Sequence, residues 1–365
     1  MRRRNDVTLT KLIILIVLIL MTPLFVANSQ VQGGVPSQSP VNTAANSQST
    51  APANAQSEPS PPTSGDQGAA PGEGQNPDST DRGVFVFRKE VNEVVLHATV
   101  IDSKQHIVTT LDKSDFQVYE NNLPQTITSF RHEDIPVAMG IVVDNSGSMR
   151  EKRAKVNAAA LNLVRASNPN DEVFIVNFND EYYLDQDFTS NIKKLKEGLE
   201  KIEARGGTAL YDAVVASADH LKDQAKLEKK IIIVVTDGDD NESGETLERT
   251  VRRLQAENGP IVYAIGILEK DDHPKHAKRA LQAMAESTGG IAFFPQTLDE
   301  VDAISRTVAH DIRNQYTIGY KPATPKRQGG YRQVKVEAHS HSHGKLAVRT
   351  KSGYYAVPEP ASSAQ

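Results

Sequence analysis

Residues 137–149 have the sequence VAMGIVVDNSGSM, in which seven consecutive apolar or glycine residues lead directly into a polar loop. A run without a polar position is typical of a β-strand that is covered on both faces. Three further segments are nearly continuous apolar runs: Val173–Phe178, Ile231–Val235 and Ile261–Ile267. The sequence therefore predicts a central sheet whose strands are buried on both sides.

Apolar residues at helical spacing fill the intervals between these strands. Val156, Ala160 and Leu163 share one helical face. The same spacing recurs in three later segments: 192–202, 247–254 and 301–312. Strands that alternate with helices predict an α/β fold with a mostly parallel, doubly wound, Rossmann-like sheet over residues 134–313.

The segments on either side, 83–133 and 314–357, have apolar residues at every second position, as in half-buried antiparallel strands. Each segment offers too few strands to cover its own apolar face. We expect the two to pair in one small β-sandwich, with the α/β domain inserted between them. The alternatives are two separate β subdomains, or extra strands on the edge of the central sheet.

The N-terminal residues 1–29 contain three arginines followed by an apolar stretch of ~15 residues, a pattern typical of a secretory signal. Cleavage of this segment and its retention as a membrane anchor both remain open. Residues 30–82 are rich in Pro, Ser, Gln and Ala, which predicts a disordered linker, and 358–365 predict a disordered tail. We therefore expect export to the periplasm, the cell surface or the medium.

The composition excludes several classes of function. The chain has no cysteine, which rules out disulfides, thiolate nucleophiles and cysteine-ligated metals. Its 46 acidic and 41 basic residues give a formal net charge of −5, so no general basic field favours nucleic acid. The oligomeric state is left open.

Side chains with oxygen ligands gather in three loops where strands end or helices begin. Asp144, Ser146 and Ser148 follow the first central strand, Thr208 follows two glycines before a helix, and Asp237 follows the strand at 231–235. Ligands bind at the carboxyl ends of the strands in a doubly wound sheet. Two carboxylates and three hydroxyls, with no His or Cys, suit Mg²⁺, Mn²⁺ or Ca²⁺.

Each of these loops also has a purely structural explanation. Ser148 and Glu151 fit a helix capping box, Thr208 fits a helix N-cap, and Asp237-Gly238 fits a turn. Their joint occurrence at one sheet edge favours a metal site.

The pattern Asp144-x-Ser146-x-Ser148, with Thr208 and Asp237, resembles the metal-ion-dependent adhesion site of von Willebrand factor type A domains. The resemblance covers about residues 135–312, and the flanks Thr126–Pro136 and Tyr316–Tyr320 resemble an exported bacterial subgroup. It implies direct ligation by the three hydroxyls, with both carboxylates close and often acting through water. A sixth coordination position, flanked by Asn145, Gly207 and Gly238, would take a carboxylate of a protein partner.

We therefore expect an exported, divalent-cation-dependent protein-binding module of the adhesion type. One alternative is a subunit of an envelope assembly or chaperone-type complex, and another is a metal-dependent hydrolase. We expect no enzyme, because the sequence has no Gly-x-Ser-x-Gly elbow and no P-loop, and neither His132 nor His220 is clearly near the site.

His339, His341 and His343 alternate along the chain beside Gly344. A continued strand would place the three imidazoles on one solvent-facing side. The sequence leaves open whether they bind a metal or only end a solvated hairpin.

Overall fold

The computed structural model describes residues 93–268, 273–325 and 328–358, and the structural statements below concern these residues. The predicted export segment, the linker and all but the first residue of the predicted tail lie outside them, so those predictions stay predictions. No helix in the described ranges combines the length and the apolar character needed to cross a membrane.

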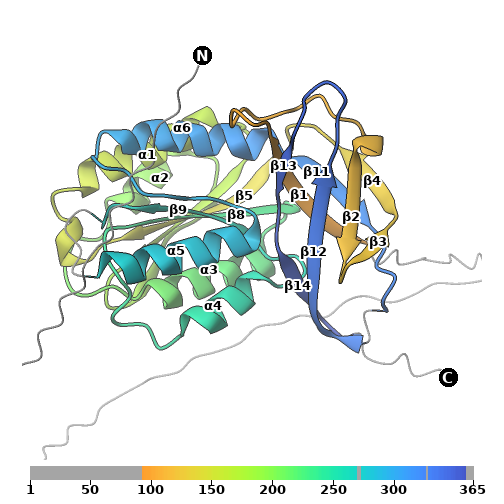
Figure 1. Ribbon diagram of the computed structural model, residues 1–365. Helices are drawn as coiled ribbons and strands as arrows, with labels where there is room; N and C mark the ends of the chain where they lie inside the picture. The colour runs from red at the N-terminus through yellow and green to blue at the C-terminus, as the bar shows by residue number, and fades with distance from the viewer. Residues whose placement is uncertain (1–92, 269–272, 326–327, 359–365) are drawn as a thin grey trace, which may run out of the picture. The chain divides into compact units, whose positions relative to one another are not determined.

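A six-stranded sheet forms the centre of the α/β region, in the order β10-β9-β8-β5-β6-β7 (Figure 1). Its strands are β5 (Val137–Asp144), β6 (Glu172–Phe178), β7 (Tyr182–Thr189), β8 (Lys229–Thr236), β9 (Ile261–Gly266) and β10 (Ala292–Phe293). Every neighbouring pair is parallel except β6 and β7. This is the strand order of a doubly wound sheet, so the predicted fold class is confirmed.

Three helices cover each face of this sheet (Figure 1). One face carries α1 (Arg153–Ala166), α2 (Ile192–Leu199) and α6 (Glu300–Arg313), and the other carries α3 (Leu210–Gln224), α4 (Leu247–Leu254) and α5 (Pro274–Thr288). All eight residues of β5 are buried, as its apolar run predicts. At Gly140 an added Cβ would lie 2.3 Å from the Phe174 ring, so only glycine allows β5 and β6 to pack this closely.

Strand β7 was not predicted from the sequence. It is the antiparallel edge strand of the central sheet, and none of its eight residues is fully buried. A half-exposed edge strand has no continuous apolar run and no clean apolar face, which are the two signals used to find the other strands.

Two four-stranded antiparallel sheets lie beside the α/β region, in the orders β13-β1-β11-β4 and β14-β12-β2-β3. Their strands are β1 (Val94–Ile101), β2 (Phe116–Glu120), β3 (Leu123–Gln125), β4 (Ile127–Arg131), β11 (Tyr316–Tyr320), β12 (Gly330–Ala338), β13 (Ala347–Arg349) and β14 (Gly353–Ala356). Each sheet combines strands from before and after the α/β region, and one hydrophobic core joins both sheets. This is the predicted sandwich, rather than two separate subdomains or an extension of the central sheet.

Strand β11 differs from its predicted half-buried state, because all five of its residues are buried. It lies between β1 and β4, so both of its edges are paired. Next to it, the Gln315 side-chain amide donates to the hydroxyls of Thr99 at 3.2 Å and Tyr263 at 3.3 Å. These bonds link the sandwich to β9 and show that the second face of this sheet packs on the α/β region.

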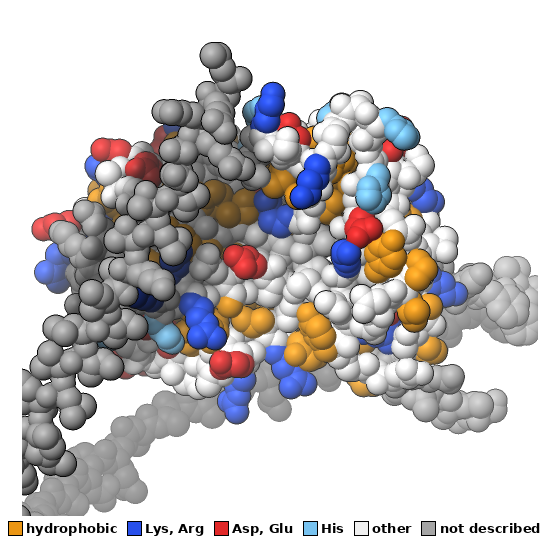
Figure 2. All heavy atoms as spheres, viewed as in Figure 1, with side chains coloured by type: hydrophobic (Ala, Val, Ile, Leu, Met, Phe, Trp, Pro, Cys, Tyr) orange, Lys and Arg blue, Asp and Glu red, His pale blue; other side chains and the backbone are white. Residues whose placement is uncertain are grey.

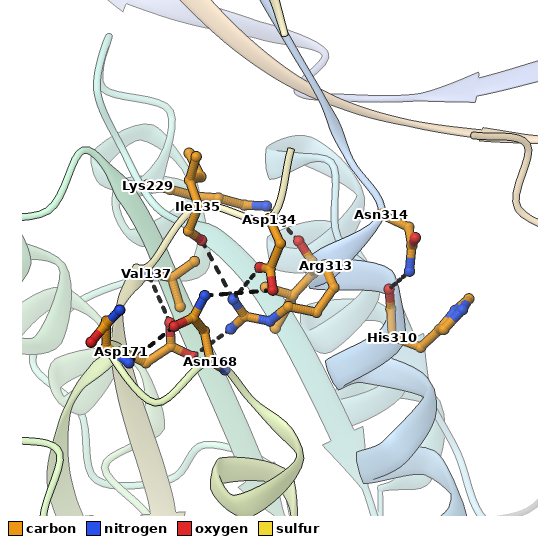
Figure 3. A network of polar contacts seen from close by, with 11 residues as sticks. Asp134, Ile135, Val137, Asn168, Asp171, Lys229, His310, Arg313 and Asn314 are labelled. Atoms are coloured by element: carbon orange, nitrogen blue, oxygen red, sulfur yellow. Dashed lines mark hydrogen bonds and ion pairs between the residues drawn. The ribbon is translucent and has the colours of Figure 1, made fainter. Parts of the chain in front are cut away.

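The chain passes between sandwich and α/β region twice, and Arg313 joins the two crossings (Figure 3). Its guanidinium lies between Asp134, before β5, and Asp171, before β6, with 2.6 Å to the Asp134 carboxylate. Asp171 also accepts the Val137 backbone N–H at 2.8 Å. The start of the central sheet is thereby tied to the end of α6.

Lys229, the first residue of β8, is buried beside this network, and its ammonium donates to the Ile312 carbonyl at 2.5 Å. Burial, with a contribution from the Arg313 charge, lowers the pKa of Lys229 to about 7. In the unfolded chain the lysine stays charged up to about pH 10.4. The folded state therefore bears a cost below pH 7, and this cost disappears as the pH rises towards 10.

We expect Lys229→Met to raise the free energy of unfolding by about 2 kcal/mol at pH 7, because no charge then needs to be buried. Its advantage over the wild type should shrink between pH 7 and pH 10, as the lysine becomes neutral in both states. Urea unfolding followed by circular dichroism at several pH values measures this, with the exposed Lys226→Met as control. If the stability gain of Lys229→Met did not change with pH, the lowered pKa of Lys229 would be contradicted.

Candidate metal centre

The candidate metal centre lies where β5 and β8 end side by side. Asp144 is the last residue of β5, and Asp237 directly follows β8. The helices that follow these strands, α1 and α4, pack on opposite faces of the sheet. In doubly wound sheets, ligands bind at the strand ends where the connections diverge in this way. The sandwich adjoins the other end of the central sheet, where the parallel strands begin (Figure 1).

Ser146, Ser148 and Asp237 are in direct contact. The two serine hydroxyls are 3.0 Å apart, and the Ser148 hydroxyl donates to Asp237 Oδ1 at 2.8 Å. Ser148 lies in a short 3-10 turn, Gly147–Met149, which curls the loop after β5 back over the strand ends. The predicted capping box with Glu151 is not used, because α1 begins only at Arg153.

Asp144 lies behind these groups and is fully buried. Its carboxylate accepts the Thr236 hydroxyl at 2.6 Å and the Ser146 backbone N–H at 2.7 Å. Burial nevertheless raises the pKa of Asp144 to about 6, and the negative charge of Asp237 adds to the shift. A carboxylate that is costly to ionise here would gain much from a nearby cation.

Thr208 is buried on a neighbouring loop that touches the serine loop, where the Gly147 N–H donates to the Gly206 carbonyl at 3.2 Å. The backbone N–H of Thr208 donates to Asn241 Oδ1 at 2.8 Å, which fixes the loop in place. Gly206 has φ +73°, and a Cβ there would lie 2.3 Å from the Asp180 carboxylate, so glycine is required. The N-cap of α3 is Ala209, so Thr208 does not serve as the predicted cap.

The three flanking residues differ in accessibility. Gly207 and Gly238 are partly exposed, whereas the Asn145 side chain is buried. Neither polar atom of the Asn145 amide has a hydrogen-bond partner among the described residues. Its backbone N–H donates to the Phe178 carbonyl at 2.6 Å, and its carbonyl accepts the Arg205 N–H at 2.8 Å.

Three residues that help to build the centre were missed in the sequence: Lys152, Thr236 and Asn241. Thr236 and Asn241 hold Asp144 and Thr208, respectively, and the Lys152 ammonium contacts Asp237 Oδ2. Lys152 lies just before α1 and its partner Asp237 is 85 positions away, so no local sequence signal indicates this contact.

The donor set fits a hard divalent cation. Ser146, Ser148, Thr208 and the two carboxylates offer only oxygen, which suits Mg²⁺, Mn²⁺ or Ca²⁺. No group of three or more His, Cys, Asp or Glu side chains in the described part of the chain could hold a metal. A cation here would therefore depend on the hydroxyls as much as on the carboxylates.

The three histidines lie at the end of a hairpin, one of the two interpretations that the sequence left open, and do not form a row on one strand face. Strand β12 ends at Ala338, and His341 and His343 lie in the following turn. His343 Nδ1 contacts the hydroxyl of Ser342 at 2.8 Å, and Gly344 has φ +66°. Figure 2 shows histidine side chains at this end of the sandwich surface, as expected for a solvated hairpin.

Comparisons with known proteins identify the α/β region. A family model described as von Willebrand factor type A domain matches residues 139–239, which include all five predicted site positions. No curated protein matches the chain.

Similar solved structures include a von Willebrand factor type A protein from Catenulispora acidiphila, 15% identical over 66% of this chain and 72% of that chain, with a TM-score of 0.43. An aerotolerance-related membrane protein from Bacteroides fragilis is 21% identical over 48% of this chain and 98% of the other, with a TM-score of 0.40. Proximal thread matrix protein 1 from the mussel byssus, solved with zinc in its MIDAS motif, is 19% identical over half of each chain, with a TM-score of 0.41.

The family match spans the strands and loops that carry the site. It agrees with the resemblance that the five motif residues indicate. The chain contains a von Willebrand factor type A domain.

Proposed function

We propose that this chain is an exported protein-binding module of the adhesion type, in which a divalent cation at the candidate metal centre captures an acidic residue of a protein partner. One observation carries the proposal. The Ser148 hydroxyl contacts both the Ser146 hydroxyl at 3.0 Å and Asp237 at 2.8 Å, and the buried Asp144 accepts the Ser146 backbone N–H at 2.7 Å.

The chemistry of the donors favours an acidic ligand. Ser146, Ser148 and Thr208 would hold the cation through neutral hydroxyls, and Asp144 and Asp237 would add charge from close by. When bound, the cation supplies a positive charge that its neutral ligands do not offset, which attracts a carboxylate from outside. Mg²⁺ is the first candidate, because it tolerates shells that mix protein oxygens and water.

The surroundings favour binding over catalysis. Metal-assisted hydrolysis needs a base placed near the reacting water. The ring of His132 packs on Tyr316 of the sandwich at 4.6 Å, and His220 pairs with Asp187 on the edge strand β7 at 2.9 Å. Neither of these histidines contacts Asp144 or Asp237. His276 contacts Asp239, two residues after Asp237, at 2.6 Å, and its Nδ1 is paired with that carboxylate. We therefore propose binding and assign no enzymatic activity.

Export and the division into domains rest on the sequence. We propose that residues 1–29 direct export or anchor the chain, and that 30–82 form a spacer ahead of the folded part. We further propose a type A domain over 134–313, with 83–133 and 314–357 as the two halves of the sandwich and 358–365 as a tail.

The proposal is tested by metal-dependent capture. The purified chain is immobilised and exposed to envelope or cell-surface proteins, once with Mg²⁺ and once with chelator. We expect a partner that is held only with Mg²⁺ and that loses at least about tenfold in affinity when one acidic residue is changed to its amide, since a charge-assisted contact is lost. A partner that is retained equally in chelator would contradict the proposal.

A further inference from the structure

Lys152 meets the candidate metal centre from the start of α1, where it is the N-cap residue. Its ammonium contacts Asp237 Oδ2, while Oδ1 of the same carboxylate accepts the Ser148 hydroxyl at 2.8 Å. The Asp237 side chain is 0% exposed and that of Lys152 is 11% exposed. This ion pair is therefore part of the centre and is sheltered from solvent.

Arg153, the next residue, extends this pattern into the interior. Its guanidinium donates to the Leu199 carbonyl at the end of α2 and lies within the electrostatic influence of both Asp144 and Asp185. Of these two cations, Lys152 is the one that contacts a carboxylate of the centre. Asp144, Asp237 and Lys152 together carry a formal charge of −1.

We propose that Lys152 is a tethered competitor cation that lowers the affinity of the candidate metal centre for a divalent ion. The inference rests on the proposed function and deepens it. A dication placed among the serine hydroxyls must share Asp237 with an ammonium that already holds one of its oxygens. Like charges on one buried carboxylate repel each other strongly, because little water screens them.

The same arrangement makes the loaded centre more positive. With a dication added, the formal charge of Asp144, Asp237, Lys152 and the ion together becomes positive. An incoming carboxylate removes this positive charge. Lys152 therefore weakens the binding of the metal and strengthens the attraction of the loaded centre for an acidic ligand. A bound partner would in turn help to retain the metal.

Calorimetric titration of the purified chain with Mn²⁺ alone tests this inference. Lys152→Met should bind Mn²⁺ about tenfold more tightly than the wild type, because the competing charge is removed. Lys152→Arg, which keeps the charge, should stay within about threefold of the wild type. The matched control is Lys155→Met on the same helix, whose exposed ammonium pairs with Asp299 at 2.7 Å and which should also change little.

Thermal unfolding gives a second readout that does not depend on the titration. In chelator, Lys152→Met should unfold at a lower temperature than the wild type, because Asp237 loses its partner. Mn²⁺ should raise the unfolding temperature of the variant by more than it raises that of the wild type. Equal or weaker Mn²⁺ affinity in Lys152→Met than in the wild type would overturn the inference about Lys152 and would leave the metal site intact. Absence of Mn²⁺ binding by the wild type would overturn the proposed function itself.

Discussion

Asp144→Ala is expected to reduce binding of Mg²⁺ and Mn²⁺ by at least about a hundredfold while the fold persists. Asp144 is fully buried behind the serine loop, and its two hydrogen bonds come from Thr236 and Ser146. A cation would lose both the charge and the group that orients Ser146. Calorimetry with each ion measures the affinity, and circular dichroism in chelator checks the fold.

The same substitution should not destabilise the chain in chelator at pH 7. Burial raises the pKa of Asp144 to about 6, so the ionised carboxylate costs free energy when no cation is near it. This cost is present above pH 6 and is relieved as the pH falls through 6, because the protonated group is then favoured. Asp144→Asn should likewise lose metal affinity and should likewise not be destabilised in chelator at pH 7.

A matched control is Asp219→Ala, on the surface of α3, where the carboxylate pairs with Arg253. It should leave the metal affinity unchanged within about twofold, because a distant exposed charge is screened. Retention of wild-type affinity in Asp144→Ala would show that the cation binds elsewhere.

The positions of the five motif residues could be predicted because each is tied to a local signal. Asp144 and Asp237 end apolar runs that could only be buried strands, and parallel strands bring their carboxyl ends to one edge. Contacts between the loops could not be predicted in this way. Lys152 reaches Asp237 across 85 positions of sequence, and its pairing depends on where α1 begins.

The hairpin end, and not a row on one strand face, is the interpretation of the three histidines that holds, for a related reason. Alternation predicts a strand only while the chain remains extended, and β12 ends at Ala338. The turn is closed by an isolated bridge between Ser340 and Gly344, and the left-handed backbone of Gly344 reverses the chain. Gly344 was visible in the sequence, and glycine at positive φ is a turn signal that outweighs alternating polar residues.

The sandwich contains a buried ion pair that neither flank could have indicated alone. Glu120 of β2 pairs with Arg332 of β12 at 3.4 Å, and their side chains are 1% and 2% exposed. The hydroxyls of Tyr320 and Tyr354 donate to the same carboxylate at 2.7 and 2.8 Å. Strands from before and after the inserted type A domain thus share one polar centre.

This arrangement makes Arg332→Met the most destabilising substitution that we predict in the sandwich. It removes the guanidinium that also donates to the Thr324 and Pro325 carbonyls at 2.9 and 2.8 Å, and it leaves the Glu120 charge buried without a cation. The expected loss is about 3–5 kcal/mol of unfolding free energy, as for other buried pairs that lose one partner. Urea unfolding followed by circular dichroism measures it.

The double variant Glu120→Leu with Arg332→Met separates the ion pair from simple packing. Replacing both partners by apolar side chains of similar size removes the unpaired charge, so most of the lost stability should return.

Hydrogen exchange in Val94–Ile101 tests whether the two flanks depend on each other, because β1 pairs with β11 and β13 from the other half of the chain. Arg332→Met should accelerate exchange in β1, although the substitution lies in β12 of the other sheet. Unchanged protection of β1 together with a full loss at β12 would show that the two sheets unfold separately, against the single shared core.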